Sequence, residues 1–446
     1  MKKAWFHIIN SVHDRILVMC GGGVRNIQFS LETYMSNKEK YGEVITPSWF
    51  VNNMLDYLPQ HIFKETERTW LDPGAGTGHF SLSLYQRGIR KILMIEINNK
   101  HVKTLRSIFG SEKVLQGDFL SLQQKFDTIV GNPPFNSGGL KKVPTNKALK
   151  KKNDGETIWP KFVRHAVSLL NEGGILSMIV PSIWMRPDRA GMYEFMLQYR
   201  LENIRCFSNT ETNRIFGGEC QTPTCFFTLY KEPRRETISL YDGNKMINYP
   251  IKKNWPIPVH GASVIKKLLP FVEKYGYLKV RKTNTAPKGT TFSMYKTQEN
   301  PYKNIRTCRV HRKSQPYLVY EYTNKKMMYS DTEKLVLAHK MHGFPFLDKG
   351  LGISRRDNYV ILENMEIWAQ FLSTRLARYI FEAARYRMMY LERWAFQFIP
   401  DISKIKGFPE EEEAQMRWFG LEEGEIQLIL ARREYESAYD HRNDTV

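Results

Sequence analysis

Residues 72–78 read Asp-Pro-Gly-Ala-Gly-Thr-Gly, and this stretch predicts the fold of the chain around it. The preceding Trp70 and Leu71 have the apolar character of a strand end, and residues 79–86 have the spacing of an amphipathic helix. A glycine-rich turn between a strand and a helix lets the backbone approach a nucleotide-like ligand closely, because no side chain stands in the way. The loop alone does not choose among such ligands, since dinucleotide-binding enzymes share it.

The segment from residue 70 to residue 230 alternates short β-rich runs with amphipathic stretches. We expect strands at 91–97, 114–119, 126–130, 175–180 and 222–230. Helices are expected at 79–86, after the capping residue Asn98, and at 158–170, the last of them closed by Gly173 and Gly174. Strands that alternate with helices form a parallel sheet with helices on both faces. The sequence therefore predicts an α/β fold, a doubly wound Rossmann-like domain of about seven strands.

Acidic residues end the two strands expected after the glycine loop. Glu96 ends the strand at 91–97, 18 positions beyond Gly78, where a carboxylate can accept both hydroxyls of a ribose. Asp118 ends the next strand, within Gln-Gly-Asp-Phe, and can accept a hydrogen bond from an adenine amine. Together with the glycine loop, the two carboxylates predict a site for a cofactor that contains a nucleoside.

The strand at 126–130 runs directly into Asn132-Pro133-Pro134-Phe135. An exocyclic amine conjugated to an aromatic ring is a poor nucleophile, because its lone pair is delocalised. The Asn132 side-chain carbonyl and the Pro133 backbone carbonyl can accept both N–H bonds of such an amine and direct its lone pair toward an electrophilic methyl. The two prolines fix the backbone, and Phe135 offers a face for an unstacked base. These residues indicate an amino-group methylation site, whereas the motif alone is equally typical of a Pro-Pro turn that ends a strand.

With this order of motifs, the chain resembles the gamma class of N6-adenine DNA methyltransferases, in which the cofactor loop precedes the catalytic loop and the target-recognition domain comes last. The resemblance covers residues 38–430 and includes Gly-Glu-Val-Ile-Thr-Pro at 42–47. It implies S-adenosylmethionine as cofactor, flipping of an adenine from double-stranded DNA, and a restriction-modification, orphan or phage-like role. Phe135 departs from the tyrosine of many relatives, which keeps the stacking face and loses a hydroxyl.

The resemblance also implies a role for each residue of the site. The catalytic residues are Asn132, Pro133, Pro134 and Phe135. The cofactor-binding residues are Thr46 and Pro47 in the pocket wall, Asp72, Gly74 and Gly76 at the amino-acid part, Glu96 at the ribose, and Asp118 and Phe119 at the adenine. No metal is implied.

The net charge of +20 is unevenly distributed along the chain. Residues 231–400 hold 31 basic against 14 acidic residues, whereas residues 401–446 hold 6 against 12. An excess of this size on one block is expected of a surface that follows a polyphosphate, because each neutralised phosphate releases a counterion. Six lysines crowd residues 141–152, and nine basic residues within 281–313 are interleaved with aromatic ones. We interpret both clusters as nucleic-acid contacts, although a solvated loop would explain the lysines as well.

The sequence pattern changes after residue 235, and four segments are predicted. They are a peripheral N-terminal extension at 1–34, a cofactor-binding catalytic domain at 35–235, a basic, mixed α+β target-recognition domain at 236–400, and an acidic segment at 401–446. The third segment is expected to contain a long helix from Asn364 to Trp394. No nuclease-like stretch is recognised before residue 40, so a fused restriction activity is not expected.

Composition and cysteine usage are those of an ordinary globular protein. Hydrophobic residues make up 42% of the chain, and no apolar run approaches the ~20 residues of a membrane span. Five cysteines are scattered without a CxxC pair, which argues against a disulfide framework and against a zinc site. We therefore expect a cytoplasmic monomer without a membrane or metal partner.

Several alternatives stay open at the level of sequence. The same chemistry would act on adenine in structured RNA, or on the glutamine amide of a release factor, which similar Asn-Pro-Pro sites also methylate. The basic block favours nucleic acid over a protein amide. A catalytically silent binding module is disfavoured because Asp72, Glu96, Asp118 and Asn132 are all intact. N4-cytosine transfer is disfavoured because those relatives more often carry serine at the position of Asn132.

Overall fold

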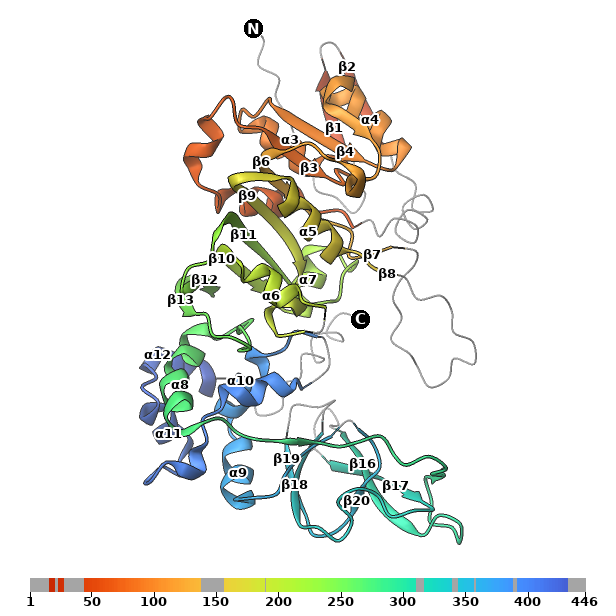
Figure 1. Cartoon of the computed structure of the whole chain (residues 1–446), viewed down its shortest axis with the longest axis vertical. Coiled ribbons are helices and arrows are strands. Elements are labelled where there is room, and N and C mark those ends of the chain that lie inside the picture. The colour runs from red at the N-terminus through yellow and green to blue at the C-terminus, as the bar shows by residue number, and fades with distance from the viewer. Residues whose placement is uncertain are drawn as a thin grey trace.

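The computed structural model describes residues 44–137, 156–188, 190–309, 317–338, 344–356, 358–387 and 391–431, together with the backbone of an N-terminal hairpin. Figure 1 shows an elongated molecule: a large sheet with its helices lies at one end, a group of helices in the middle, and two small sheets at the other end. The hairpin consists of β1 (Ile16–Cys20) and β2 (Gly23–Ile27), which pair antiparallel. It falls within the predicted N-terminal extension, whose peripheral role stays a prediction.

The large sheet has nine strands within the described residues. Their order across the sheet is β13 (Lys245–Pro250), β12 (Thr237–Asp242), β10 (Tyr199–Phe207), β11 (Thr224–Pro233), β9 (Leu170–Pro181), β6 (Phe126–Gly131), β3 (Trp70–Pro73), β4 (Ile92–Glu96) and β5 (Val114–Gln116). Strands β5, β4, β3, β6 and β9 run parallel, and β11 is antiparallel to both of its neighbours. The predicted doubly wound α/β fold is confirmed. The hairpin β12–β13 adds two strands to the seven expected and carries the sheet beyond residue 235, while the predicted domain limits stay a prediction.

Helices cover both faces of this sheet. They are α2 (Ser48–Asp56), α3 (His79–Gln86), α4 (Asn99–Phe109), α5 (Trp159–Leu169), α6 (Met192–Met196) and α7 (Asn209–Ile215), with the 3-10 helices η1 (Gln60–Lys64), η2 (Ser111–Lys113), η3 (Phe119–Ser121) and η4 (Ser182–Met185). Adjacent strand residues divide between two hydrophobic clusters. Trp70 and Val130 pack with α2, α3 and α4, whereas Leu71 and Ile129 pack with α5 and α6. This alternation is expected of a sheet that is buried on both faces.

The connection from α5 to β9 differs from the prediction. Helix α5 ends at Leu169 and β9 begins at Leu170, so Gly173 and Gly174 lie inside the strand and do not close the helix. The pairing of β6 with β9 is irregular here, and a Cβ on Gly174 would lie 2.8 Å from the carbonyl oxygen of Asn171. The glycines therefore serve a bulge in the strand. A bulge and a helix C-cap look alike in sequence because both use glycine.

A group of helices follows the large sheet. It comprises α8 (Ala262–Tyr275), α9 (Met365–Leu372), α10 (Arg375–Ala383), α11 (Glu412–Trp418) and α12 (Glu423–Leu430), with the 3-10 helices η5 (Arg393–Phe398) and η6 (Ile402–Lys404). The single helix expected from Asn364 to Trp394 is instead broken into α9 and α10. Ser373 ends α9, and the Thr374 side chain caps α10 by accepting a hydrogen bond from the backbone of Ala377 at 3.1 Å. Such hydroxyl side chains compete for backbone groups, so the helix breaks although the apolar spacing continues.

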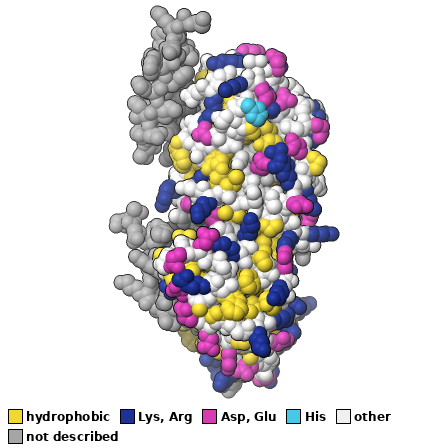
Figure 2. Space-filling view, turned by 90° about the vertical axis from the view of Figure 1, so that its left-hand side faces the viewer, with side chains coloured by type: hydrophobic (Ala, Val, Ile, Leu, Met, Phe, Trp, Pro, Cys, Tyr) yellow, Lys and Arg dark blue, Asp and Glu magenta, His cyan; other side chains and the backbone are white. Residues whose placement is uncertain are grey.

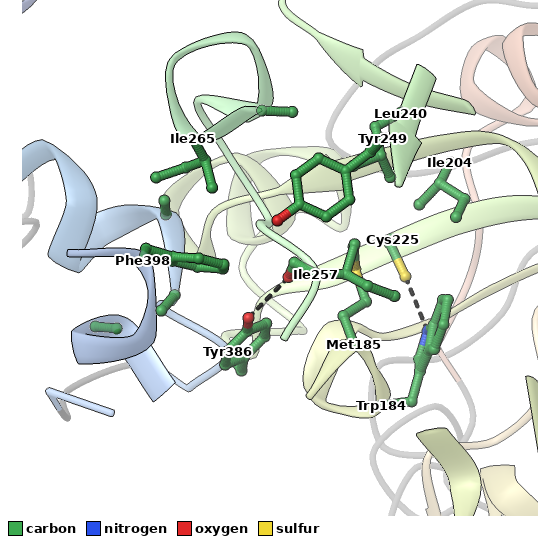
Figure 3. Close-up of a cluster of buried hydrophobic side chains, with 14 of the residues drawn as sticks. Trp184, Met185, Ile204, Cys225, Leu240, Tyr249, Ile257, Ile265, Tyr386 and Phe398 are labelled. Atoms are coloured by element: carbon green, nitrogen blue, oxygen red, sulfur yellow. Dashed lines mark hydrogen bonds between the residues drawn. The ribbon is translucent and has the colours of Figure 1, made fainter. Parts of the chain in front are cut away.

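The helical group packs directly against the large sheet, as Figure 3 shows. The hydroxyl of Tyr386 donates a hydrogen bond to the carbonyl of Ile257 at 2.7 Å, and the backbone N–H of Ile257 donates to the carbonyl of Met185 at 2.8 Å. On the sheet side, Trp184 Nε1 lies 3.2 Å from the Cys225 sulfur. Buried hydrogen bonds of this kind fix the orientation of packed elements in addition to holding them together.

Part of the predicted acidic segment packs on the same helices. Glu412 accepts a hydrogen bond from Arg375 Nε at 3.0 Å and also bonds to the backbone N–H of Arg375, at the start of α10. Lys267 of α8 forms ion pairs with Glu422 and Glu425 at 3.1 and 2.6 Å. Because a carboxylate is favoured at a helix N-terminus, these acidic residues stabilise the helical group.

Two small four-stranded sheets form the far end of the molecule. One contains β14 (Arg281–Lys282), β21 (Asn358–Ile361), β18 (Lys334–Ala338) and β19 (Pro345–Asp348), and the other contains β15 (Phe292–Ser293), β17 (Tyr317–Thr323), β16 (Tyr302–Arg309) and β20 (Gly352–Ile353). A small apolar cluster built from Ile305, Val336, Ile353 and Val360 joins them. We call residues 281–361 the β-domain.

Two properties of the surface bear on function. Among the described residues, no helix is long and apolar enough to cross a membrane. Figure 2 shows the left-hand face of the view in Figure 1, where acidic and basic side chains are interspersed. The basic excess of the chain therefore forms no continuous patch on the part of this face that the structure describes.

Candidate active site

The glycine loop lies at the carboxyl end of β3. The backbone N–H groups of Gly74 and Ala75 donate to the carbonyl of Ile95 at 2.9 and 3.1 Å, which ties the loop to β4. Gly78 has a φ of +84°, and a Cβ there would lie 2.7 Å from a methyl carbon of Leu105. Only glycine fits this position. Because Gly78 takes this conformation, helix α3 can start directly after the loop.

Glu96 joins the loop to the start of α4. Its two oxygens accept hydrogen bonds from the backbone N–H groups of Gly76 and Asn98, each at 2.7 Å, and its side chain is 7% exposed. Asn98 caps α4 as predicted, by accepting from the backbone of Lys100 at 3.1 Å. Each carboxylate oxygen has a second lone pair, so Glu96 can still accept hydrogen bonds from ligand hydroxyls.

Asp72 is buried at the end of β3. It accepts hydrogen bonds from the hydroxyl and the backbone N–H of Ser81, at 2.6 and 3.2 Å. Burial raises the pKa of Asp72 to about 7, and the neighbouring charge of Glu96 adds to the increase. A positively charged ligand group beside these carboxylates would favour their ionised forms. The pair is therefore suited to a cation.

Asp118 and Phe119 follow β5, and the structure separates their environments. Asp118 is exposed and caps η3 by accepting from the backbone of Leu120 at 3.0 Å. Phe119 is 3% exposed, and its ring centroid lies 5.0 Å from that of Phe162 and 4.9 Å from that of His165. The contacts of Asp118 and Phe119 with adenine stay a prediction. Because Phe119 is buried, it would offer the ligand only a small part of its ring.

Ile97 is a candidate residue that sequence reasoning missed. It directly follows Glu96 at the end of β4 and is 51% exposed. An exposed apolar side chain beside the carboxylate that is predicted to bind a ribose offers a surface for the flat face of a base. The sequence pattern predicts it as the last residue of the strand at 91–97. The position of Ile97 in the sequence could have indicated this role. If Glu96 is the last residue of the strand, the residue after it lies outside the strand and can be exposed.

Asn132 lies directly after β6, which neighbours β3 in the sheet. Its Nδ2 donates hydrogen bonds to Thr46 Oγ1 at 3.0 Å and to the carbonyl of Val44 at 3.3 Å. Its Oδ1 is buried and accepts no hydrogen bond from any described residue. A buried carbonyl without a partner is costly, and it is expected where a ligand supplies the missing donor. Thr46, predicted only to line the pocket, thus holds the amide of Asn132 in one orientation.

The rest of the motif is anchored on its other side. Pro133 is buried, whereas Pro134 and Phe135 are half-buried. The carbonyl of Phe135 accepts a hydrogen bond from Ile158 at 3.1 Å, which ties the motif to the start of α5. The short strands β7 (Asn136–Ser137) and β8 (Glu156–Thr157) then pair with each other. The lysine cluster at 141–152 and the first residues of the motif at 42–47 lie outside the described residues.

Part of the chain matches a known protein family. Residues 77–216 match the model of the Eco57I restriction-modification methylase. This segment is an Eco57I-family methylase domain. It contains Glu96, Asp118 and the whole Asn-Pro-Pro-Phe motif, and the resemblance that these motifs indicated is confirmed.

Individual proteins are similar to different lengths of this chain. It is 28% identical to the type II methyltransferase M.VspI of Vibrio sp. (strain 343) over 162 residues, which cover 32% of this chain and 38% of that protein. It is 27% identical to a tRNA1(Val) (adenine(37)-N6)-methyltransferase of Porphyromonas gingivalis over 190 residues, or 39% of this chain and 71% of that one. Among solved structures, the type IIG restriction endonuclease BpuSI aligns with 91% of this chain and 65% of its own, at 12% identity and a TM-score of 0.43. The match with M.VspI spans well under half of that protein.

An Eco57I-family methylase domain implies S-adenosylmethionine as cofactor, and the residues present fit it. The buried carboxylates of Asp72 and Glu96 suit a ligand with positive charge and ribose hydroxyls. The glycine loop leaves the backbone open beside them, and Ile97 offers an apolar surface. Asn132 lies at the end of the strand beside the loop, which is where the methyl acceptor would enter.

Proposed function

We propose that this chain transfers a methyl group from S-adenosylmethionine to N6 of an adenine in double-stranded DNA. The observation that carries the proposal is the buried Oδ1 of Asn132, which has no partner among the described residues while its Nδ2 is held by Thr46. An acceptor fixed in this way is suited to an amine that donates a hydrogen bond. The target amine of adenine is such a group.

The chemistry follows from the positions of these groups. Asn132 Oδ1 and the carbonyl of Pro133 accept the two N–H bonds of the adenine amine, which localises the lone pair on N6. S-adenosylmethionine would supply an electrophilic methyl: the lone pair of N6 would form the new bond, the electron pair of the sulfur–methyl bond would remain on sulfur, and N6 would release one proton to water. Thr46 prevents rotation of the amide, so that an acceptor and not a donor meets the amine. Phe135 offers its ring to the base that has left the stack.

The proposal of duplex DNA as the substrate is supported by the β-domain. Its surface exposes aromatic side chains among basic ones: Tyr295 is 80% exposed, and Arg281 and Lys282 are also exposed. Basic residues that neutralise phosphates give affinity for a nucleic acid through counterion release. A protein amide such as glutamine would not need a surface of this kind.

Adenine in structured RNA is the second candidate. The similarity to a tRNA adenine-N6 methyltransferase over 190 residues favours it, because the target amine is chemically the same. The two candidates differ in how the base is reached. Duplex DNA requires unpairing of the adenine, whereas RNA offers adenines that are already unpaired in loops.

One experiment separates the candidates. The purified chain and its Asn132→Ala variant are incubated with isotope-labelled S-adenosylmethionine and, in parallel, with DNA from a methylation-free host, unmodified tRNA transcripts and a glutamine-containing release-factor peptide. We expect label only in the DNA, recovered by nucleoside mass spectrometry as N6-methyladenine, and none with the variant. Label in tRNA alone would establish the second candidate. If calorimetry showed cofactor binding and no nucleic acid took up label, the proposal would be wrong.

A further inference from the structure

We infer that Arg355 reads a guanine of the target sequence and that Glu321 and Phe292 hold its side chain in place for this contact. The inference rests on the proposed function, because it assigns one element of the site that would recognise duplex DNA. It concerns the sheet formed by β15, β17, β16 and β20 in the β-domain. In Figure 1, β16 and β17 lie on the same side of the view as β7 and β8, which follow the Asn-Pro-Pro-Phe motif.

A buried carboxylate fixes one edge of the Arg355 side chain. Glu321 lies on β17 and is 2% exposed. Arg355 Nε lies 2.7 Å from one of its carboxylate oxygens, and Arg355 Nη2 donates to the other at 2.8 Å. The hydrogen bond from Nη2 and the ion-pair contact at Nε hold the guanidinium at two points along one edge. Glu321 therefore determines the direction of the remaining N–H groups.

An aromatic ring covers one face of the same guanidinium. The central carbon of the Arg355 guanidinium lies 4.2 Å from the ring centroid of Phe292, which is on β15 and is 38% exposed. Stacking on the ring restricts rotation out of the plane that Glu321 defines. Arginine is therefore ordered before any ligand arrives, and little side-chain entropy is lost on binding.

The outer edge of Arg355 is left for a ligand. Its side chain is 37% exposed, and Nη1 forms no hydrogen bond with the described part of the chain. The Nη1 and Nη2 groups at this edge present two parallel N–H donors. The O6 and N7 atoms of guanine in the major groove accept such a pair, which is the commonest base-specific contact of arginine.

Buried polar groups hold the backbone beneath this element. Asn358 is fully buried, and its Nδ2 donates to the carbonyls of Arg355 and Arg306 at 3.2 and 3.4 Å. Asn304, also fully buried, donates to Thr323 Oγ1 at 2.8 Å. The Oδ1 atoms of both asparagines are buried and accept no hydrogen bond from a described residue, which costs stability, so the use of asparagine here is explained by the backbone carbonyls and the hydroxyl that its Nδ2 holds in place.

The fixed geometry of Arg355 favours a base over a phosphate as the ligand. Glu321 keeps the direction of the Arg355 N–H groups, and direction is what a base edge requires. By contrast, Lys282 and Lys296 are exposed and form no ion pair with a described residue. Such uncompensated charges suit phosphates, which attract charge with little regard to geometry.

The test begins with the target sequence of the natural chain, read by modification-sensitive sequencing of a methylation-free host. Synthetic duplexes are then made in which each guanine of that sequence is replaced in turn by 7-deazaguanine, which lacks the N7 acceptor. We expect one position to lower the methylation rate at subsaturating DNA by about 10-fold or more, because one of the two hydrogen bonds from Arg355 is lost. With Arg355→Ala, the same replacement should have no further effect, and that position should accept other bases.

Controls keep the outcomes distinct. Arg356→Ala removes an exposed neighbouring charge and should keep the target sequence, and Glu321→Gln should relax only the position that Arg355 reads. Unchanged cofactor affinity of each variant shows that it is folded, and the 7-deazaguanine series with the natural chain does not depend on any variant. The inference is overturned if no guanine position is sensitive, or if Arg355→Ala weakens all sequences equally and flattens the salt dependence as a phosphate contact would. If the natural chain methylates no DNA at all, it is the proposed function that fails.

Discussion

The edge of the large sheet that carries Glu96 and the small sheet that carries Glu321 both bury a carboxylate, at 7% and 2% exposure, but give it different partners. Glu96 accepts hydrogen bonds from backbone N–H groups, which are neutral, so its negative charge stays available to a ligand. Glu321 binds the guanidinium of Arg355, and Arg306 Nε lies 3.6 Å from it. The same residue type thus leaves one site negative and the other positive.

This difference matches the ligands that we propose for the two regions. S-adenosylmethionine carries a sulfonium and an ammonium group, whereas DNA is a polyanion with acceptor atoms on its bases. The comparison also predicts a separation of effects. Substitutions at the sheet edge should change the rate or the cofactor affinity at an unchanged target sequence, and substitutions in the β-domain should change the target sequence at unchanged cofactor affinity.

The largest effect is expected for Asn132→Ala. The variant removes one of two acceptors for the adenine amine, so the methylation rate should fall by about 10²- to 10³-fold or more. Cofactor affinity, measured by calorimetry, should change by no more than a few-fold, because the proposed contact of Asn132 is with the amine and not with the cofactor. Asn171→Ala is the matched control, since its Nδ2 bonds to Asp127 at the amino end of β6. If Asn132→Ala lowered cofactor affinity by as large a factor as the methylation rate, Asn132 would not have the proposed role of accepting hydrogen bonds from the amine.

Glu96→Gln should act on cofactor affinity. The amide keeps the shape of the side chain and loses the charge, so its hydrogen bonds to ribose hydroxyls weaken. Loss of one charge-assisted hydrogen bond should increase the dissociation constant of the cofactor by about 10- to 100-fold. Glu321→Gln provides the comparison across the two regions, because it should leave the dissociation constant of the cofactor unchanged. If both variants lowered cofactor affinity alike, the proposed separation would not hold.

The sequence predicted the sheet edge well because its signals are local. The glycine loop, Glu96 and Asn98 each act within a few residues of their position, and β3, α3, β4 and α4 follow in the expected order. The same is true of Asn132, which directly follows β6 as expected from the motif. Local chemistry is sufficient where a strand, a turn and a helix follow one another directly.

The contacts that sequence could not give join distant residues. Thr46 and Asn132 are 86 positions apart, and Glu321 and Arg355 are 34 apart. Nothing in the sequence around these residues indicates that the two members of either pair are in contact. The prediction that Gly173 and Gly174 close a helix was wrong for another reason. Glycine is used both in strand bulges and at helix ends, so the sequence does not distinguish the two. The break between α9 and α10 was masked by apolar spacing that continues through Thr374.

A pH-dependent effect is expected at Asp72. Its pKa of about 7 in the folded chain lies above the ordinary aspartate value of 3.8, so the folded state holds a proton that the unfolded state has lost, and stability falls as the pH rises from about 4 to 7. Asp72→Asn removes this cost and should melt a few degrees higher than the natural chain at pH 8, with the difference shrinking toward pH 4. Cofactor affinity should rise with pH between about 6 and 8 in the natural chain, because the ionised carboxylate binds the cation, and should be low and nearly constant in the variant.

Asp127 is the control with the opposite sign. Although its partial burial acts the other way, hydrogen bonds from Thr69 and Asn171 lower the pKa of Asp127. This carboxylate therefore stabilises the fold above its unfolded pKa and loses that contribution as the pH falls. Asp127→Asn should melt lower than the natural chain at pH 8, as measured by calorimetric scans across pH. Equal shifts of both variants in the same direction would show that the pH dependence arises elsewhere.

The smallest effect is expected for Thr46→Val, which keeps the shape of the side chain and removes the oxygen that holds Asn132 Nδ2 at 3.0 Å. The amide then keeps only its bond to the carbonyl of Val44, at 3.3 Å, and can turn its nitrogen toward the substrate. Loss of one neutral hydrogen bond should lower the single-turnover rate by about 2- to 10-fold. Thr46→Ser restores the hydroxyl and should recover most of the rate, which a purely steric role of Thr46 in the pocket wall would not explain. If valine and serine behaved alike and cofactor affinity fell instead, Thr46 would belong to the cofactor pocket alone, and the fixed amide would have to be explained by Val44.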